Sequence, residues 1–143
     1  MPKTFIPKEK DFARKTYLIN AEGKTLGRLA TRVAALLIGK GKTVFAKDQL
    51  SGDSVVIINA KHVHVTGKKR EQKIYTHYTG YSAGLRTVSF EEMQAKKPEE
   101  IILLAVTRML PNTKLGREMR RRLRVYAGSE HRQQAQNPVP LEV

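Results

Sequence analysis

The segment 114–124 carries six of the 27 Lys and Arg residues of this 143-residue chain. In a helix, at about 100° per residue, Leu115, Met119 and Leu123 share one apolar side. The opposite side holds the cations Lys114, Arg117, Arg120, Arg121 and Arg124. A planar guanidinium can bind two phosphate oxygens at once, so the pattern predicts a helix with one face for a core and one for phosphates. The alternative is a solvated helix face, although so many cations beside the single Glu118 would repel one another without an anionic partner.

A second segment, from Lys68 to Tyr81, interleaves cations with three of the five tyrosines and one of the four histidines. Cations neutralise phosphates while aromatic faces stack on bases or riboses, a combination that suits single-stranded or looped RNA. The candidate RNA-binding residues here are Lys68, Lys69, Arg70, Lys73, Tyr75, His77, Tyr78, Gly80 and Tyr81. In the alternative interpretation, Tyr75 and Tyr81 are core or edge aromatics and the lysines are only solvated.

The turn Gly23-Lys24-Thr25 follows an expected strand and opens an expected helix, which is where a phosphate-binding loop would sit. A Walker A loop needs glycine where Leu18 stands, and a dinucleotide-binding loop needs glycine where Thr25 stands. Nucleotide hydrolysis is therefore not expected. Two interpretations remain: the helix N-terminus with Lys24 and Arg28 holds a phosphate of a polyanion, or Gly23 forms a plain left-handed turn.

Metal-ion and catalytic sites have weak support. His62 and His64 would share one face of a strand, but no Cys or carboxylate at ligand spacing joins them, so no metal site is expected. Asp48 and Asp53 could coordinate a cation, although aspartates in turns are more common. No nucleophile elbow and no acid–base pair appear, so we expect neither an enzyme nor a cofactor or small-molecule substrate.

The net charge of +14 and the pI of about 10.2 imply a polyanionic partner, with nucleic acid first and an anionic membrane second. Membrane binding is the weaker candidate because no expected helix pairs its cations with Trp or Phe. No apolar run approaches the ~18 residues of a spanning helix, and residues 1–7 lack the apolar stretch of a signal peptide. The chain also has no Cys. We therefore expect a soluble protein that is not secreted, and the absence of Cys fits a reducing compartment.

The first half of the chain predicts an α/β unit. Residues 1–15 contain two prolines and no periodicity, which indicates an extended basic arm. A strand is expected at 16–20 and a helix from Leu26 to Gly39, where apolar residues recur every three or four positions. The apolar run 54–59 is typical of a central strand buried on both faces in a parallel sheet. Further strands are expected at 63–65 and 73–77, on either side of a basic turn.

The second half predicts mainly helices. Ser89 and Glu92 form the pattern of a capping box, and Pro98 followed by two acids is favourable at a helix start. That helix would bury Ile101, Ile102, Ala105, Val106 and Met109. A short edge strand is expected at 124–128, and residues 129–143 show no period. The order favours one three-layer α/β domain with its core at 16–128 and an irregular C-terminal tail at 129–143.

Several blocks of the sequence closely resemble the L-thirteen family of large-subunit ribosomal proteins in its bacterial form. These blocks are residues 27–31, 52–53, 65–68, 75–80, 109–117 and 123–128. The resemblance is nearly end to end, and Met109 to Arg117 is its most specific part. It implies an α/β/α domain with a parallel sheet of about four strands, binding to large-subunit ribosomal RNA beside neighbouring ribosomal proteins, a role in early subunit assembly, and no catalysis. By position, Lys68, Tyr75, His77, Gly80, Arg117 and Arg120 fall in the family's RNA-facing segments.

The chain also departs from the family pattern. Where many relatives have His-His-Thr-Gly-His, residues 77–81 read His-Tyr-Thr-Gly-Tyr, and the usual Gly-Gly becomes Ala83-Gly84. Gln133 stands where relatives tend to carry a second His after the equivalent of His131. These differences favour aromatic stacking over a metal or proton role for this region.

Overall fold

Four parallel strands form the main sheet of the computed structural model, which describes residues 7–8 and 11–143. The strands are β1 (Thr16–Asn20), β2 (Ser54–Ile58), β5 (Leu123–Val125) and β6 (Val139–Pro140), in the order β5-β2-β1-β6. Val55, Val56 and Ile57 are buried, because the apolar run of β2 has a neighbouring strand on each side and packed side chains above and below. The prediction of a central, doubly buried strand is confirmed.

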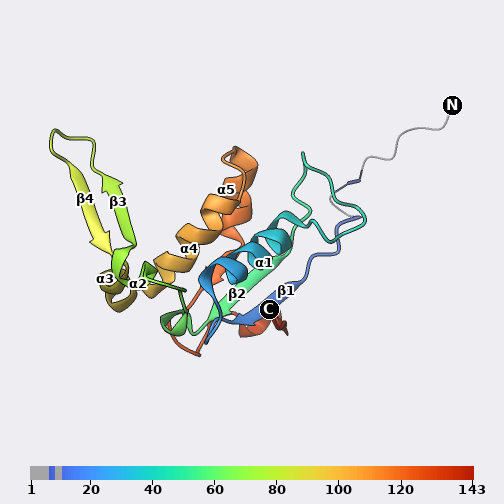
Figure 1. Cartoon of the computed structure of the whole chain (residues 1–143). Coiled ribbons are helices and arrows are strands. Elements are labelled where there is room, and N and C mark those ends of the chain that lie inside the picture. The colour runs from blue at the N-terminus through green and yellow to red at the C-terminus, as the bar shows by residue number, and fades with distance from the viewer. Residues whose placement is uncertain (1–6, 9–10) are drawn as a thin grey trace.

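Two long helices, α1 (Leu26–Ile38) and α4 (Pro98–Met109), pack side by side over this sheet (Figure 1). α1 contacts β2, and α4 contacts β5. Ile101, Ile102 and Val106 of α4 are buried as expected, but Ala105 is only half-buried and Met109 is 43% exposed. The chain is thus an α/β domain with a four-stranded parallel sheet, consistent with the predicted three-layer architecture.

Local capping signals define the helix ends. α1 ends at Gly39, whose left-handed backbone (φ 83°) lets its N–H donate to the carbonyls of Ala35 and Leu36. The short helix α3 (Phe90–Lys96) begins at Ser89, and the Glu92 N–H donates to the Ser89 hydroxyl oxygen at 3.3 Å. Both boundaries confirm the sequence-based expectation, because each depends on residues within a few positions of the helix end.

The Arg-rich helix is shorter than predicted. It is α5 (Lys114–Arg121), and Leu123 and Arg124 lie in β5. The Val55 N–H donates to the Arg122 carbonyl, so the chain pairs with β2 from Arg122 onward. The helix therefore ends before Leu123, although the helical pattern of the sequence continues to Arg124. Leu123 is buried as expected, but it reaches the core from a strand. The expected edge strand is present, although it begins at Leu123 instead of Arg124 and ends at Val125.

Residues 63–65 do not form the expected strand. A 3₁₀ turn, η2 (Ala60–His62), follows β2, and His64 makes only a single bridge with Thr25. The turn starts at Asn59, whose left-handed backbone (φ 59°) directs the chain out of the sheet. His62 and His64 therefore do not share a strand face.

The expected strand at 73–77 belongs to a separate hairpin. β3 (Ile74–Tyr78) pairs antiparallel with β4 (Leu85–Ser89), which sequence reasoning did not identify, and the two project from the body of the molecule (Figure 1). The basic turn before β3 contains a one-turn helix, α2 (Lys69–Gln72). The alternation of exposed and buried residues is weak in these strands, so their pairing had no clear signal in the sequence.

The two ends of the chain differ from the expectation in different ways. Of the expected arm, residues 1–6 and 9–10 lie outside the described residues, and residues 12–15 form no helix or strand. The C-terminal segment, expected to be irregular, contains a 3₁₀ turn, η3 (Gln134–Gln136), and the strand β6. β6 pairs with β1 at the sheet edge, where Pro140 is tolerated because its missing N–H is not needed by another strand.

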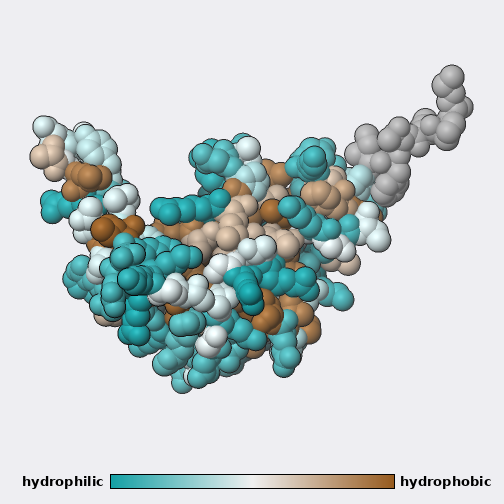
Figure 2. All heavy atoms as spheres, in the orientation of Figure 1, coloured by the Kyte–Doolittle hydropathy of each residue, from teal (hydrophilic) through white to brown (hydrophobic). Residues whose placement is uncertain are grey.

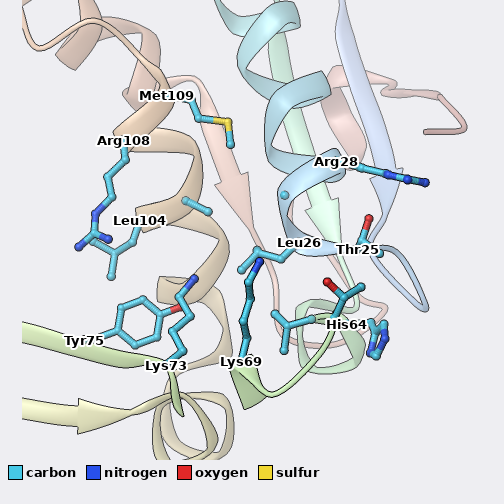
Figure 3. A pocket seen from close by; sticks show the side chains of 14 residues that line it. Thr25, Leu26, Arg28, His64, Lys69, Lys73, Tyr75, Leu104, Arg108 and Met109 are labelled. Carbon is cyan, nitrogen blue, oxygen red and sulfur yellow. The ribbon is translucent and has the colours of Figure 1, made fainter. Parts of the chain in front are cut away.

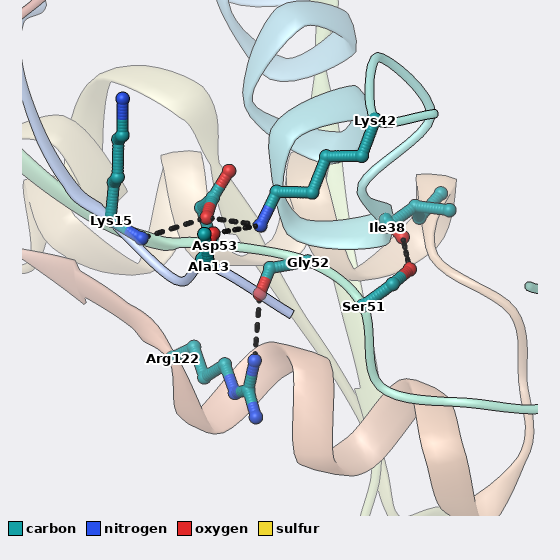
Figure 4. Close-up of polar contacts among 8 residues, drawn as sticks. All are labelled: Ala13, Lys15, Ile38, Lys42, Ser51, Gly52, Asp53 and Arg122. Atoms are coloured by element: carbon teal, nitrogen blue, oxygen red, sulfur yellow. Dashed lines mark hydrogen bonds and ion pairs between the residues drawn. The ribbon is translucent and has the colours of Figure 1, made fainter. Parts of the chain in front are cut away.

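A partly buried ion pair fixes the loop before β2 (Figure 4). The Asp53 carboxylate, only 4% exposed, accepts hydrogen bonds from Lys42 Nζ at 2.6 Å and from the Lys15 N–H at 2.9 Å. Lys42 Nζ also donates to the Ala13 carbonyl at 2.8 Å. Asp53 therefore connects the start of β2 to the segment just before β1 and to the loop that follows α1. This assigns it a structural role in the turn, while Asp48 is exposed.

Replacing Lys42 by Met is expected to destabilise the fold by about 2–4 kcal/mol, because it leaves the buried Asp53 carboxylate without its cation. Urea unfolding followed by circular dichroism measures the change. The double variant Lys42→Met/Asp53→Asn should recover part of the loss, since it removes the unpaired charge. Equal stability of the single variant and the parent would contradict this role.

Candidate nucleic-acid interface

The helix α5 presents its cations to solvent and packs its other side on the core. Arg117, Arg120 and Arg121 are exposed, whereas Gly116 and Met119 are buried and Leu115 is half-buried. Arg121 Nη1 forms an exposed ion pair with Glu118 Oε1 at 2.8 Å. The predicted two-faced helix is therefore confirmed over residues 114–121.

The remaining residues of the Arg-rich segment have different surroundings. Arg124 is exposed on β5. Arg122, which follows α5, donates from Nη1 to the Gly52 carbonyl at 2.8 Å (Figure 4), so it helps hold α5 against the loop before β2. We define the α5 surface as the exposed cations Lys114, Arg117, Arg120 and Arg121 of α5, together with Arg124 of the strand β5 that follows it.

The β3–β4 hairpin exposes apolar and aromatic side chains. Ile74 is 60% exposed, Tyr78 60%, Leu85 62% and Tyr81 79%. Hydrophobic residues stand out among hydrophilic ones on this projecting element (Figure 2). Exposed apolar side chains gathered on a protruding element are typical of a binding surface.

The loop of the hairpin is ordered by backbone contacts. The Thr79 N–H donates to the Gly84 carbonyl at 3.0 Å, and the Gly84 N–H donates to the Tyr81 carbonyl at 2.9 Å. Gly80 has a positive φ of 91°, which brings the chain round between Tyr78 and Tyr81. His77 is exposed and lies opposite Arg86 of β4, a cation that the sequence-based list did not contain. We define the hairpin surface as His77, Tyr78, Gly80, Tyr81 and Arg86.

Tyr75 is placed differently from the other two tyrosines. Its side chain is 6% exposed and belongs to the core cluster, so it offers no free face for stacking on a base. Lys73 Nζ lies 5.3 Å from the centroid of its ring. Of the two interpretations weighed from the sequence, that of a core aromatic holds for Tyr75 and fails for Tyr81.

The cations of the basic turn are exposed. Lys68 precedes α2, and Lys69 and Arg70 lie on it. Arg70 Nε is 3.4 Å from Glu91 Oε1 in an exposed ion pair. Such a pair contributes little to stability and leaves the guanidinium able to exchange partners.

Lys24 and Arg28 flank the start of α1, and both are exposed. Gly23 has a φ of 68°, which confirms a left-handed turn there. Thr25 occupies the N-cap without a side-chain cap, and the first turn of α1 contains no acidic residue. Arg28 lines a pocket beside the start of α1, with its guanidinium pointing away from Lys69 and Lys73 (Figure 3).

Within residues 7–8 and 11–143, no group of three or more His, Cys, Asp or Glu residues is arranged to hold a metal ion. The same part of the chain contains no helix of the length and hydropathy needed to cross a membrane.

The sequence that forms these elements can be compared with known protein families. The family model for Ribosomal protein L13 matches residues 14–132, which include the main sheet except β6, the helices α1 to α5 and the hairpin. The chain belongs to the L13 family of ribosomal proteins. This confirms the resemblance inferred from the sequence blocks.

Curated members of the L13 family align with nearly the whole chain. Large ribosomal subunit protein uL13 of Clostridioides difficile is 52% identical over 139 residues, covering 97% of each chain. The protein of that name from Thermus thermophilus is 50% identical over 141 residues, covering 99% of each, and that from Symbiobacterium thermophilum is 49% identical over 143 residues, covering all of both.

The block that carried most of the resemblance to the L13 family has a structural explanation. The Thr113 hydroxyl oxygen caps α5 by accepting from the Gly116 N–H at 3.3 Å. Gly116 packs so closely on the Pro111 carbonyl that a side chain would collide with it. The Pro, Thr and Gly of this block therefore set the angle at which α5 leaves α4.

Proposed function

We propose that this chain is a structural constituent of the large ribosomal subunit that binds large-subunit ribosomal RNA and supports early subunit assembly and translation. It would act in the cytoplasmic subunit beside neighbouring ribosomal proteins and catalyse no reaction. The observation that carries the proposal is the match to the L13 family over residues 14–132. The net charge of +14 and the exposed cations of α5 support it independently.

The proposed mechanism uses two surfaces of the chain. The α5 surface neutralises phosphates and releases counterions, a contribution that is independent of sequence and falls steeply with salt. The hairpin surface adds aromatic faces that stack on unpaired bases and backbone that approaches the RNA at Gly80. A chain that carries both surfaces can bridge RNA segments that repel one another when bare.

Cations near the N-terminus of α1, in the basic turn and just after α2 extend this interface. The proposal includes Lys24, Arg28, Lys68, Lys69, Arg70 and Lys73 as phosphate-binding residues, and it leaves Tyr75 out of the stacking residues because the ring is buried. It adds Arg86, which the pairing of β3 and β4 places beside His77.

Replacing Tyr81 by Ala is expected to weaken binding to large-subunit RNA by about 1–3 kcal/mol, because one stacking face is lost. Filter binding at several salt concentrations measures the affinity, and the salt slope should stay unchanged since no charge is removed. Tyr81→Phe keeps the aromatic face and should bind as the parent does. A loss of equal size in the Phe variant would contradict stacking.

Depletion of the chain in growing cells tests the proposed function. Early action predicts that large-subunit precursors accumulate while small subunits continue to form, and that re-expression of the chain restores mature large subunits. Normal accumulation of large subunits in depleted cells would contradict the role in assembly.

A further inference from the structure

A pocket lies between the N-terminal end of α1, the basic turn with α2, and the C-terminal half of α4. Its volume is about 610 Å³, and Figure 3 shows the side chains that line it. Leu26, Leu104 and Met109 form apolar walls, while Lys69, Lys73 and Arg108 supply charge. Arg108 was not among the residues singled out from the sequence.

The charge of this pocket is not balanced. Its lining residues, all within the described part of the chain, include no Asp or Glu, and no ion pair is found there for Lys69, Lys73 or Arg108. The ammonium groups of Lys69 and Lys73 point into the same space between α1 and α4 (Figure 3). Partial burial, with Arg108 and Lys69 nearby, lowers the pKa of Lys73. Three cations gathered around one space favour an anionic ligand.

A buried hydroxyl faces the same pocket. Tyr75 lines it with a side chain that is 6% exposed, and its Oη is the one buried side-chain polar atom without a hydrogen-bond partner in the described residues. In Figure 3 this oxygen points toward the Lys73 ammonium side of the pocket. An unsatisfied buried hydroxyl is costly and rare, so it indicates a ligand that completes its hydrogen bonding.

The start of α1 adds to this environment. No side chain caps the helix at Thr25, its first turn has no acid, and Gly27 lines the pocket with open space where a side chain would be. Thr25, Leu26 and Gly27 at the start of α1 line the pocket, so the positive end of the helix dipole lies beside it. The apolar walls give room for a sugar or base beside the charged part.

We propose that this pocket binds a phosphate group of large-subunit RNA, with the attached ribose or base against Leu104 and Met109. Lys69, Lys73 and Arg108 neutralise the phosphate, and the Tyr75 hydroxyl donates a hydrogen bond to one of its oxygens. The proposal rests on the function proposed above and adds to it a specific site distinct from the α5 and hairpin surfaces.

Lysine footprinting tests the site in the intact chain. Free chain and chain bound to large-subunit RNA are acetylated briefly, and each lysine is quantified by mass spectrometry. Only the neutral amine is acetylated, and a bound phosphate favours the ammonium form of Lys73, so RNA should protect Lys73 roughly tenfold relative to the free chain. Two further samples contain millimolar inorganic phosphate or adenosine monophosphate in place of RNA. They show whether a free phosphate group protects Lys73 as RNA does.

Three variants sharpen the test. Gly27→Leu fills the pocket without changing charge and should abolish the protection of Lys73 while the α5 surface still binds RNA. Tyr75→Phe should weaken RNA binding roughly tenfold without lowering the Tm of the free chain. Arg108→Gln should weaken binding similarly, and Lys96→Gln, an equal charge change at an exposed position of α3, is the matched control.

The outcomes separate the two proposals. Protection of Lys73 by RNA, and its loss in Gly27→Leu, supports the site. Unchanged reactivity of Lys73 in an otherwise stable RNA complex overturns the site and leaves the proposed function intact. Protection of Lys73 by free phosphate but not by RNA overturns the proposal that the bound phosphate group belongs to RNA. A chain that binds no large-subunit RNA overturns both.

Discussion

A variant with Gln at the four exposed arginines of the α5 surface is expected to bind large-subunit RNA about 100- to 1000-fold more weakly at physiological salt. The four positions are Arg117, Arg120, Arg121 and Arg124. Each phosphate contact contributes roughly 0.7–0.9 to the slope of log K against log salt, so the slope should fall by about 3–4. Filter binding across a salt series measures both quantities. Arg122 is left in place because it binds the Gly52 carbonyl.

The matched control removes four exposed cations outside the proposed surfaces: Lys40, Lys47, Lys61 and Lys96. Both variants lose the same net charge, so a general effect of charge would weaken both equally. We expect the control to keep most of its affinity and slope. An unchanged slope in the arginine variant would contradict the assignment of α5, and an equal loss in the control would contradict its specificity.

The second large effect is on stability. Gly116→Ala is expected to lower the free energy of unfolding by about 3 kcal/mol. The new methyl group would overlap the Pro111 carbonyl and displace α5 from its packed position. The intrinsic gain in helix propensity, about 1 kcal/mol, is too small to offset this. Urea unfolding followed by circular dichroism gives the value. RNA affinity should fall as well, since α5 carries the arginines.

Gly27→Ala is the matched control, because Gly27 also lies in a helix but its added methyl group meets nothing within 4 Å. It should leave stability unchanged or raise it by up to about 1 kcal/mol. If both alanine variants had the stability of the parent, the close approach of Gly116 to Pro111 would not constrain the fold.

The elements that were predictable from the sequence depend on local signals. α1 combines an apolar period with a terminal glycine, β2 is a bounded apolar run, and α3 begins at a serine cap. Each signal lies within the element or at its end, so tertiary structure did not need to be known. The cation face of α5 was predictable for the same reason.

The features that were missed depend on partners far away in the chain. β6 forms only because β1 offers a free edge, and β5 begins where pairing with β2 ends the helical period. The pocket brings Lys69, Lys73 and Tyr75 close to Arg108 on α4. Arg108 lies more than thirty residues further along the chain, so no spacing pattern in the sequence indicates that these residues meet. Tyr75 and Tyr81 look alike in the sequence, yet only contacts with the core decide that one is buried and the other exposed.

The most direct test of the central claim is sedimentation of cell lysate through sucrose gradients, with the chain quantified in each fraction and the gradients repeated at rising salt. The proposed function predicts that the chain sediments with the large subunit. The variant with four glutamines should dissociate from the large subunit at a lower salt concentration than the parent chain does. Recovery of the parent chain in the light fractions at low salt, with none in the large-subunit peak, would contradict the account.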